Sequence, residues 1–468
     1  MSIKWLTFVL AGFSVIMSPL VSADNLVDVY QLAETKDPEL LGIIASRQAT
    51  LEQYPQARAQ LLPSLRFTTN LTRHSEASTS ESGSIVFLDH FTDEDYTLRL
   101  TQPVFRYDRW VQLRQAGTRI QQAAAEVDAA RQELGVRVGE RYFDVLAAED
   151  ELVFSRAAKN ALQRQLDQTN LRFEVGIIAI TDVQEAQAGY DLAVAEEIRA
   201  QNQLDNAHDA LREITGAYHK RLDVLTKEIP LILPDPADIE QWTAKALAQN
   251  LRISAASFAS QTAHQEIRRQ QAGHLPTLDI VGSLGTAATG RFAQQAPVDA
   301  GSGRIGDVDT DSSAIGVELN VPIFEGGIVV SRTHEAEHRY TQALEEVERQ
   351  KRAVQRQARD AYLGIVAGIS RVKALKQAVV SNETLVEASE AGFEVGTRTT
   401  VDVVAAQREL FRARRDYSRA RYDYLLDTLR LKGASSTLAP ADLAKISAWL
   451  GPSPRARARR RPPTGSDT

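Results

Sequence analysis

The sequence contains an internal repeat, and this repeat restricts the possible folds more than any other feature. The motif RFEVG at residues 172–176 recurs as GFEVG at residues 392–396. Three further motif pairs occur in matching order, at 62–65 and 275–278, at 102–105 and 321–324, and at 181–183 and 401–403. The chain therefore consists of two copies of one structural unit.

Each copy predicts the order helix, strand, polar loop, strand, long helix, tight turn and helix. The expected division is a first repeat at 24–228, a linker at 229–237, a second repeat at 238–440 and a C-terminal segment at 441–468 that ends in a basic, disordered tail. We expect strands at about 64–73, 94–103, 277–285 and 313–322, and hairpin turns at 176–181 and 396–401.

The predicted helices are unusually long. No proline interrupts residues 106–172, and a helix of that length spans about 100 Å at about 1.5 Å per residue. The helices predicted at 26–62 and 181–216 each span roughly half of that distance, so two short helices placed end to end match one long helix. Apolar and alanine residues that alternate at steps of three and four, from Val183 to Ile214, indicate a coiled-coil seam.

Composition and charge exclude several classes of protein. The chain has 468 residues, a net charge of -7 and no cysteine. A net negative charge gives no positive electrostatic potential that would attract a nucleic acid. The absence of cysteine excludes disulfides, thiol catalysis and cysteine metal sites. We expect no cofactor.

Residues 1–23 read as a secretory signal peptide, with Lys4, an apolar stretch and small residues before Asp24. No later segment reaches the roughly 18 apolar residues of a membrane helix. If the mature chain enters a membrane, strands must do so, and such strands close into a barrel.

The predicted strands carry that membrane signal. Apolar residues alternate with polar ones, and the lipid-facing set is expected to include Leu65, Phe67, Leu98, Ile280 and Val317. Apolar-out, polar-in strands of about ten residues are typical of water-filled transmembrane barrels. Because about eight strands are the minimum for such a barrel, four strands per chain predict that several chains share one barrel.

Three other motifs match the patterns of zinc, nucleotide and calcium sites. His334, Glu335 and His338 fit the H-E-x-x-H pattern of zinc peptidases, but charged neighbours favour a solvated helix face. Residues 301–306 match G-x-G-x-x-G without a flanking strand and helix, so we interpret them as flexible loop. The carboxylates within 307–318 have the spacing of a calcium loop, and a solubilising acidic loop is the better interpretation.

The two hairpin turns are the candidate functional region. Gly176 and Gly396 suit left-handed helix C-caps that reverse the chain. Thr181 with Gln184, and Thr399 with Asp402, resemble capping boxes that restart the helix. On this basis Asp182 and Asp402 are either helix-capping carboxylates or charges that line the mouth of a ring of helices.

Residues 172–190 and 392–402, with the following helix to Gly433, closely resemble the two hairpins of TolC-type outer-membrane efflux proteins. The resemblance covers about residues 26–438. It implies a mainly α fold with a membrane β-barrel, in which a long coiled-coil α-barrel continues into a twelve-stranded β-barrel shared by a homotrimer, four strands from each chain. It also implies a location in the outer membrane of a Gram-negative bacterium with a long periplasmic extension.

The resemblance further implies partners and a gate. Inner-membrane ABC, RND or MFS transporters would deliver drugs, small molecules or proteins through a periplasmic adaptor. The implied adaptor contacts are the hairpin tips, Val175, Gly176, Ile177, Val395, Gly396 and Thr397. The implied gate residues are Thr181, Asp182, Phe393, Arg398 and Asp402. Phe393 and Ala405 replace a tyrosine and an aspartate of the family pattern, which predicts a looser and less cation-attracting entrance.

Two other classes stay open at this stage. A secreted zinc metallopeptidase would use His334, Glu335 and His338. A structural coiled-coil surface protein without a transport role would explain the helices, but it would not explain amphipathic strands placed in repeat pairs.

Overall fold

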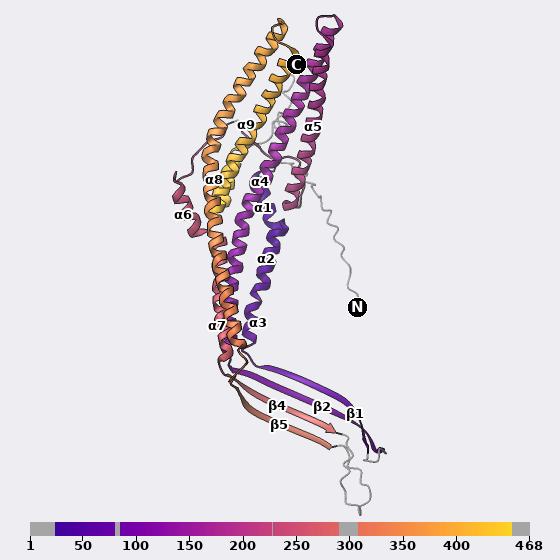
Figure 1. The fold of residues 1–468 in the computed structure, drawn as a ribbon, viewed down its shortest axis with the longest axis vertical. Helices are drawn as coiled ribbons and strands as arrows, with labels where there is room; N and C mark the ends of the chain where they lie inside the picture. The colour runs from indigo at the N-terminus through magenta and orange to yellow at the C-terminus, as the bar shows by residue number, and fades with distance from the viewer. Residues whose placement is uncertain (1–23, 80–84, 227, 290–307, 452–468) are drawn as a thin grey trace, which may run out of the picture.

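The computed structural model describes residues 24–79, 85–226, 228–289 and 308–451. The predicted signal peptide, the G-x-G-x-x-G motif and the arginine-rich tail lie outside these residues. The described chain is an elongated rod of helices with a β-sheet at one end and two helical hairpin tips at the other (Figure 1).

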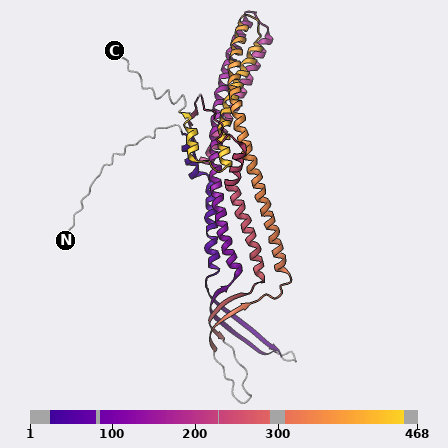
Figure 2. The ribbon, with the colours of Figure 1, turned by 90° about the vertical axis from the view of Figure 1, so that its left-hand side faces the viewer.

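Two very long helices form the length of the rod. They are α4, Tyr107–Glu174, and α8, Ile328–Glu394, and neither contains a proline. Each long helix is matched by shorter helices placed end to end along it (Figures 1 and 2). The remaining helices are α1, Leu26–Lys36; α2, Pro38–Leu51; α3, Gln53–Ala59; α5, Ile180–Thr215; α6, Ile239–Gln249; α7, Leu251–Gln271; η1, Ala272–His274; α9, Thr400–Ala434; and α10, Pro440–Ser447.

The helix predicted at 26–62 is in fact three helices. Asp37 precedes Pro38, and the residue before a proline avoids the helical conformation. Asp37 is extended, with φ −63° and ψ 116°, and its Oδ2 accepts a hydrogen bond of 2.9 Å from the Leu40 backbone N–H. The second break is at Glu52, three residues before Pro55, whose ring removes a helical backbone donor.

The four long strands form one antiparallel sheet in the order β1-β2-β4-β5. They are β1, Ser64–Thr79; β2, Ile85–Phe105; β4, Thr277–Thr289; and β5, Val308–Asn320. The pairing of β2 with β4 joins the two repeats in one sheet. Within the described residues, β1 and β5 each leave one edge without a partner strand.

Strands β1 and β2 are longer than the sequence predicted, and the additional residues lie at the end of the sheet that is farthest from the helices. β1 and β2 pair from Ser64 with Thr101 to Thr79 with Ile85, so most of the segment expected as a polar loop is strand. Alternation gives no signal there, because residues 72–79 are polar or small at nearly every position. The predicted acidic loop at 307–318 is also wrong, since Asp309, Asp311 and Glu318 all lie on β5.

The largest hydrophobic core lies near the middle of α4, at a level we call the waist. There Leu134, Tyr142 and Leu146 of α4 pack with Leu425 and Leu429 of α9. Residues of α1, α10 and the end of α5 complete the same cluster. The waist therefore holds the largest cluster of buried apolar side chains, and the rod on either side has smaller clusters.

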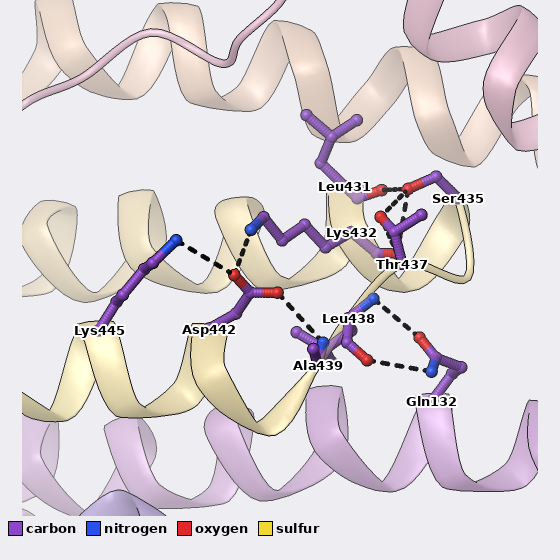
Figure 3. Close-up of polar contacts among 9 residues, drawn as sticks. All are labelled: Gln132, Leu431, Lys432, Ser435, Thr437, Leu438, Ala439, Asp442 and Lys445. Carbon is purple, nitrogen blue, oxygen red and sulfur yellow. Dashed lines mark hydrogen bonds and ion pairs between the residues drawn. The ribbon is translucent and has the colours of Figure 1, made fainter.

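The segment after α9 is fastened to the waist by polar contacts (Figure 3). The Gln132 side chain of α4 accepts a hydrogen bond from the Leu438 N–H and donates one to its carbonyl oxygen, both 3.0 Å. Lys432 of α9 forms an ion pair with Asp442 of α10. The two short strands β3, Val224–Leu225, and β6, Leu450–Gly451, then pair with each other. These contacts hold the end of the second repeat against the first.

Candidate functional site

The first hairpin turns at Val175, Gly176 and Ile177, directly after α4. Gly176 has a positive φ of 75°, a conformation that glycine adopts without strain. The Ile177 N–H donates to the Arg172 carbonyl and the Gly176 N–H to the Phe173 carbonyl, both at 2.9 Å. This is the Schellman arrangement that ends a helix and reverses the chain, as the sequence predicted.

The second hairpin turns in the same way after α8. Gly396 has a φ of 78°, and the Thr397 N–H donates to the Gly392 carbonyl at 2.8 Å. The Thr397 hydroxyl donates to that carbonyl as well, at 3.1 Å. The two tips therefore share one backbone design.

Both tips expose apolar side chains. Val175 is 69% exposed, Ile177 is 70% exposed and Val395 is 76% exposed. Large apolar side chains gathered on a soluble surface mark interaction sites. The turns therefore fix these exposed apolar side chains on the ends of long helices.

The two returning helices begin with different caps. At α9 the prediction is confirmed: Thr399 is the N-cap, its Oγ1 accepts from the Asp402 N–H at 3.3 Å, and Asp402 Oδ2 accepts from the Thr399 N–H at 2.9 Å. At α5 it is wrong, because the helix starts at Ile180, before Thr181. The N-cap there is Ala179, which has no side-chain acceptor.

The Asp402 carboxylate has a lowered pKa. Hydrogen bonds from the Thr399 backbone and hydroxyl are the main causes, and the Arg398 charge adds to them. Asp182 makes one weaker bond of the same kind, from the Ala179 N–H at 3.3 Å. Both carboxylates thus cap helices, and the lowered pKa favours the charged form of Asp402 at its tip.

Arg398 is folded back on its own hairpin. Its Nη1 lies 3.8 Å from Asp402 Oδ1, and its stem crosses Gly392. A Cβ atom at position 392 would lie 2.6 Å from the Arg398 Cγ, so only glycine leaves room for this side chain. The single chain therefore pairs Arg398 with Asp402. The link from Arg398 to Thr181 and Asp182 remains a prediction about neighbouring hairpins in an assembly.

Phe393 connects the two hairpins, with Arg172 as its partner. The Arg172 guanidinium lies 4.2 Å from the Phe393 ring centroid, and its Nη1 donates to the Phe393 carbonyl at 3.2 Å. Phe393 as a residue is 6% exposed. Sequence reasoning missed Arg172, although one signal was available: the repeat places arginine at 172 and glycine at the matching position 392.

Further from the tips, arginines of α9 pair with carboxylates of α4. The pairs are Arg415 with Glu151 at 3.3 Å, Arg419 with Asp144 at 2.9 Å and Arg430 with Glu140 at 3.3 Å. Between them, the Tyr422 hydroxyl donates to Asp150 Oδ2 at 2.9 Å. Burial raises the pKa of the Asp150 carboxyl and, well above its usual range, that of Tyr422. This seam binds the two hairpins along their length.

The sheet at the other end of the rod has one apolar and one polar face. In the register, Phe67 lies opposite Leu98 and Leu98 opposite Leu284, while Ile280 lies opposite Val317. Residues directly opposite in an antiparallel sheet point to the same side. Leu65, which lies two residues from Phe67, is on that side too. The predicted lipid-facing set therefore shares one face. In the single chain Leu98 is half-buried, and the other members are exposed: Leu65, Phe67, Ile280 and Val317.

The zinc motif is not built as a metal site. His334, Glu335 and His338 lie on the exposed side of α8, and Glu335 pairs with Arg339 at 2.5 Å. The described residues contain no cluster of three histidines or carboxylates that could hold a metal ion. Among these residues, no helix is long and apolar enough to cross a membrane.

Comparison with known proteins identifies the family. The sequence model of the outer membrane efflux protein family matches residues 29–217 and 242–436, one match in each repeat. The chain is 37% identical to outer membrane protein TolC of Escherichia coli strain K12 over 440 residues, which cover 94% of this chain and 86% of that protein. It is 29% identical to alkaline protease secretion protein AprF of Pseudomonas aeruginosa, over 95% of this chain and 91% of that protein.

Solved structures show the same fold. The outer membrane protein VceC of Vibrio cholerae superimposes with a TM-score of 0.70 at 19% identity, covering 88% of this chain and 96% of that one. The fold described above, a rod of helical hairpins with a four-stranded sheet at one end, is therefore one that solved outer membrane proteins share. The chain belongs to the outer membrane efflux protein family and is an outer-membrane protein with a long periplasmic helical part.

Proposed function

We propose that three copies of this chain form one export channel, in which a twelve-stranded barrel crosses the outer membrane and a helical tunnel crosses the periplasm. The observation that carries the proposal is the sheet: four strands with one exposed apolar face, one polar face and two edges without partners among the described residues. Pairing those edges between copies satisfies their backbone groups, and closure leaves the polar face around water.

The hairpin tips supply the proposed docking surface for a periplasmic adaptor, and through it for an inner-membrane ABC, RND or MFS transporter. Exposed Val175, Ile177 and Val395 on rigid turns are the support from the structure. The name of the relative AprF concerns protease secretion, and TolC is a second relative. The proposed cargo is therefore proteins, drugs or other small molecules passed on by such a transporter.

The same tips form the proposed gate. In a ring of three chains, Arg398 of one hairpin would meet Thr181 and Asp182 of the next, while Asp402 would contribute an acidic ring. The support is that Arg398 is held at the tip by Gly392 and Asp402, and that the Asp182 carboxylate lies in the first turn of α5, where it accepts a hydrogen bond from the Ala179 N–H. Each exposed link contributes about 0.2 to 1 kcal/mol, and three copies act together.

The oligomeric state tests this proposal directly. Protein extracted in detergent is expected to have the mass of a trimer in mass photometry and to conduct ions in planar bilayers. A stable monomer or dimer would contradict the shared barrel.

A matched pair of variants tests the two faces of the sheet. Leu98→Arg places a charge on the apolar face and is expected to cost about 2 to 4 kcal/mol near the middle of the membrane. Thr97→Arg places the same charge one residue away, on the polar face. Membrane yield is expected to fall for Leu98→Arg alone, and equal yields would mean that the faces are wrongly assigned.

A further inference from the structure

Two arginines lie side by side on the polar face of the sheet. Arg66 of β1 is directly opposite Arg99 of β2, and both side chains are exposed. Like charges directly opposite each other on one face of a sheet are destabilising. Neither arginine forms an ion pair with any described residue. The repulsion between the two guanidinium groups must therefore be screened, either by surrounding water or by a bound anion.

The level of this pair in the sheet shows that it faces water. The Arg66 and Arg99 row lies between the apolar rows of Leu65 with Leu100 and of Phe67 with Leu98. Those two rows form the centre of the apolar face. An arginine directed to lipid at that depth costs about 2 to 4 kcal/mol, whereas on the opposite face it is solvated inside the channel.

Other charges on the polar face are too distant to neutralise the pair. Asp95 is four residues from Arg99 along β2, and Asp279 and Glu318 are four residues from the same row on β4 and β5. Four residues of strand span about 13 Å, compared with a screening length of about 8 Å at physiological salt. Asp279 is already paired with Arg106.

We propose that Arg66 and Arg99 form an anion-binding band inside the outer-membrane part of the channel. The ligand class is multivalent oxyanions, because the planar guanidinium matches phosphate geometry with two parallel hydrogen bonds. The hydroxyls of Thr68 and Thr97, in the next row on this face, add donors. The inference rests on the proposed function, since the assembly brings three such pairs to one level of the lumen.

The band is opposite in charge to the acidic ring proposed at Asp402, at the other end of the rod. An ion crossing the channel would then meet a cation-attracting mouth and an anion-attracting exit in series. Selectivity would depend on the side from which a multivalent ion enters, because each ring is reached first from its own side.

Block by inorganic tripolyphosphate tests the band in planar bilayers made without lipopolysaccharide. In the wild-type channel, tripolyphosphate added on the barrel side is expected to reduce the current at a concentration at least tenfold lower than when it is added on the tip side. In the double variant Arg66→Gln with Arg99→Gln, the half-blocking concentration on the barrel side is expected to rise at least tenfold, and the reversal potential to shift toward cations.

Arg73→Gln is the matched control, because Arg73 is on the same strand but on the face of Leu65 and Phe67. It removes one charge from each chain and is expected to leave the block unchanged. The double variant Arg66→Lys with Arg99→Lys keeps both positive charges but lacks the planar guanidinium groups that donate two parallel hydrogen bonds. It is expected to show a block weaker than the wild type and stronger than the double glutamine variant. If the double glutamine variant inserts poorly, Arg99→Gln alone serves in its place.

The outcomes separate this inference from the proposed function. A wild-type protein that forms no conducting trimer overturns the proposed function itself. A conducting channel that tripolyphosphate does not block, or blocks equally in the glutamine variants, overturns the band alone. Loss of block in Arg73→Gln would assign the anion site to the lipid-facing side and would also reject the band.

Discussion

The two hairpin tips share a backbone but place their arginines differently. Before the turn, the first hairpin has Arg172 where the second has Gly392. After the turn, the first has Ile178 where the second has Arg398. Both turns keep the same Schellman hydrogen bonds and the same positive φ at glycine. The repeat therefore preserves the shape of the tip and varies the position of its positive charge.

That exchange gives each arginine a different partner. Arg172 reaches the other hairpin and covers the buried Phe393 ring, whereas Arg398 crosses Gly392 and stays beside Asp402 of its own hairpin. In the single chain, one tip therefore holds the two hairpins together. The other keeps an exposed guanidinium available to a neighbouring subunit, which is the role proposed for the gate.

The largest effect on export is expected when a bulky side chain replaces glycine at a hairpin tip. Gly396→Trp forces a side chain into a left-handed conformation, which costs about 1 to 2 kcal/mol, and it obstructs the docking surface. We expect loss of export and of adaptor cross-linking, with an intact trimer. Gly176→Trp applies the same change to the first tip, and Gly42→Trp, on the exposed side of α2, is the control. Full export by Gly396→Trp would exclude the second tip as an adaptor contact.

The next largest effect separates the two arginines. Arg398→Ser removes the proposed link between subunits, and Arg172→Ala removes a cation–π contact of about 0.5 to 2 kcal/mol within one chain. Both are expected to raise single-channel conductance in planar bilayers. Arg172→Ala is also expected to increase hydrogen exchange at the end of α8 in the detergent-solubilised protein. If Arg398→Ser conducts like the wild type, Arg398 is not part of a lock.

A smaller change tests why glycine is needed at position 392. Gly392→Ala adds a Cβ atom 2.6 Å from the Arg398 Cγ, so the arginine stem must move. We expect conductance intermediate between the wild type and Arg398→Ser, and no additional effect of Gly392→Ala when Arg398 is already serine. Additive effects in the double variant would mean that Gly392 acts separately from Arg398.

The smallest effects concern the helix caps. Thr399→Ala is expected to cost about 0.5 to 2 kcal/mol, whereas Ala179→Ser adds a cap that the first hairpin lacks and should stabilise it. Because the pKa of Asp402 is lowered on folding, its contribution is present above pH about 4 and lost as the pH falls below that value. Hydrogen exchange of the first turns of α5 and α9 measures both changes. Equal acid sensitivity of the two turns would contradict the difference between the caps.

Sequence reasoning reached the helical hairpins because their signals are local and repeated. Glycine at 176 and 396 predicted the turns, and the absence of proline from residues 106–172 predicted the length of α4. Alternation also assigned Leu65, Phe67 and Leu98 to one face of the sheet. Each of these signals depends on neighbours in sequence, which a single chain displays directly.

The failures required information that is not local. Thr181 was predicted to help cap α5, but that helix starts at Ile180, with Ala179 as its N-cap. The partnership of Arg172 with Phe393 joins residues that are far apart in sequence. The distal halves of β1 and β2 are strand because they pair with each other, although their residues do not alternate.

The waist also has a mechanical consequence. Tyr142 lies 32 residues before the end of α4 at Glu174, which gives a lever arm of about 48 Å at about 1.5 Å per residue. A rotation of about 5° about the waist therefore displaces the tip by about 4 Å, which is greater than the reach of a hydrogen bond. A small pivot at the level of the largest hydrophobic core is thus enough to separate tip contacts, while a sheet held in the proposed barrel, on the far side of the pivot, would stay in place.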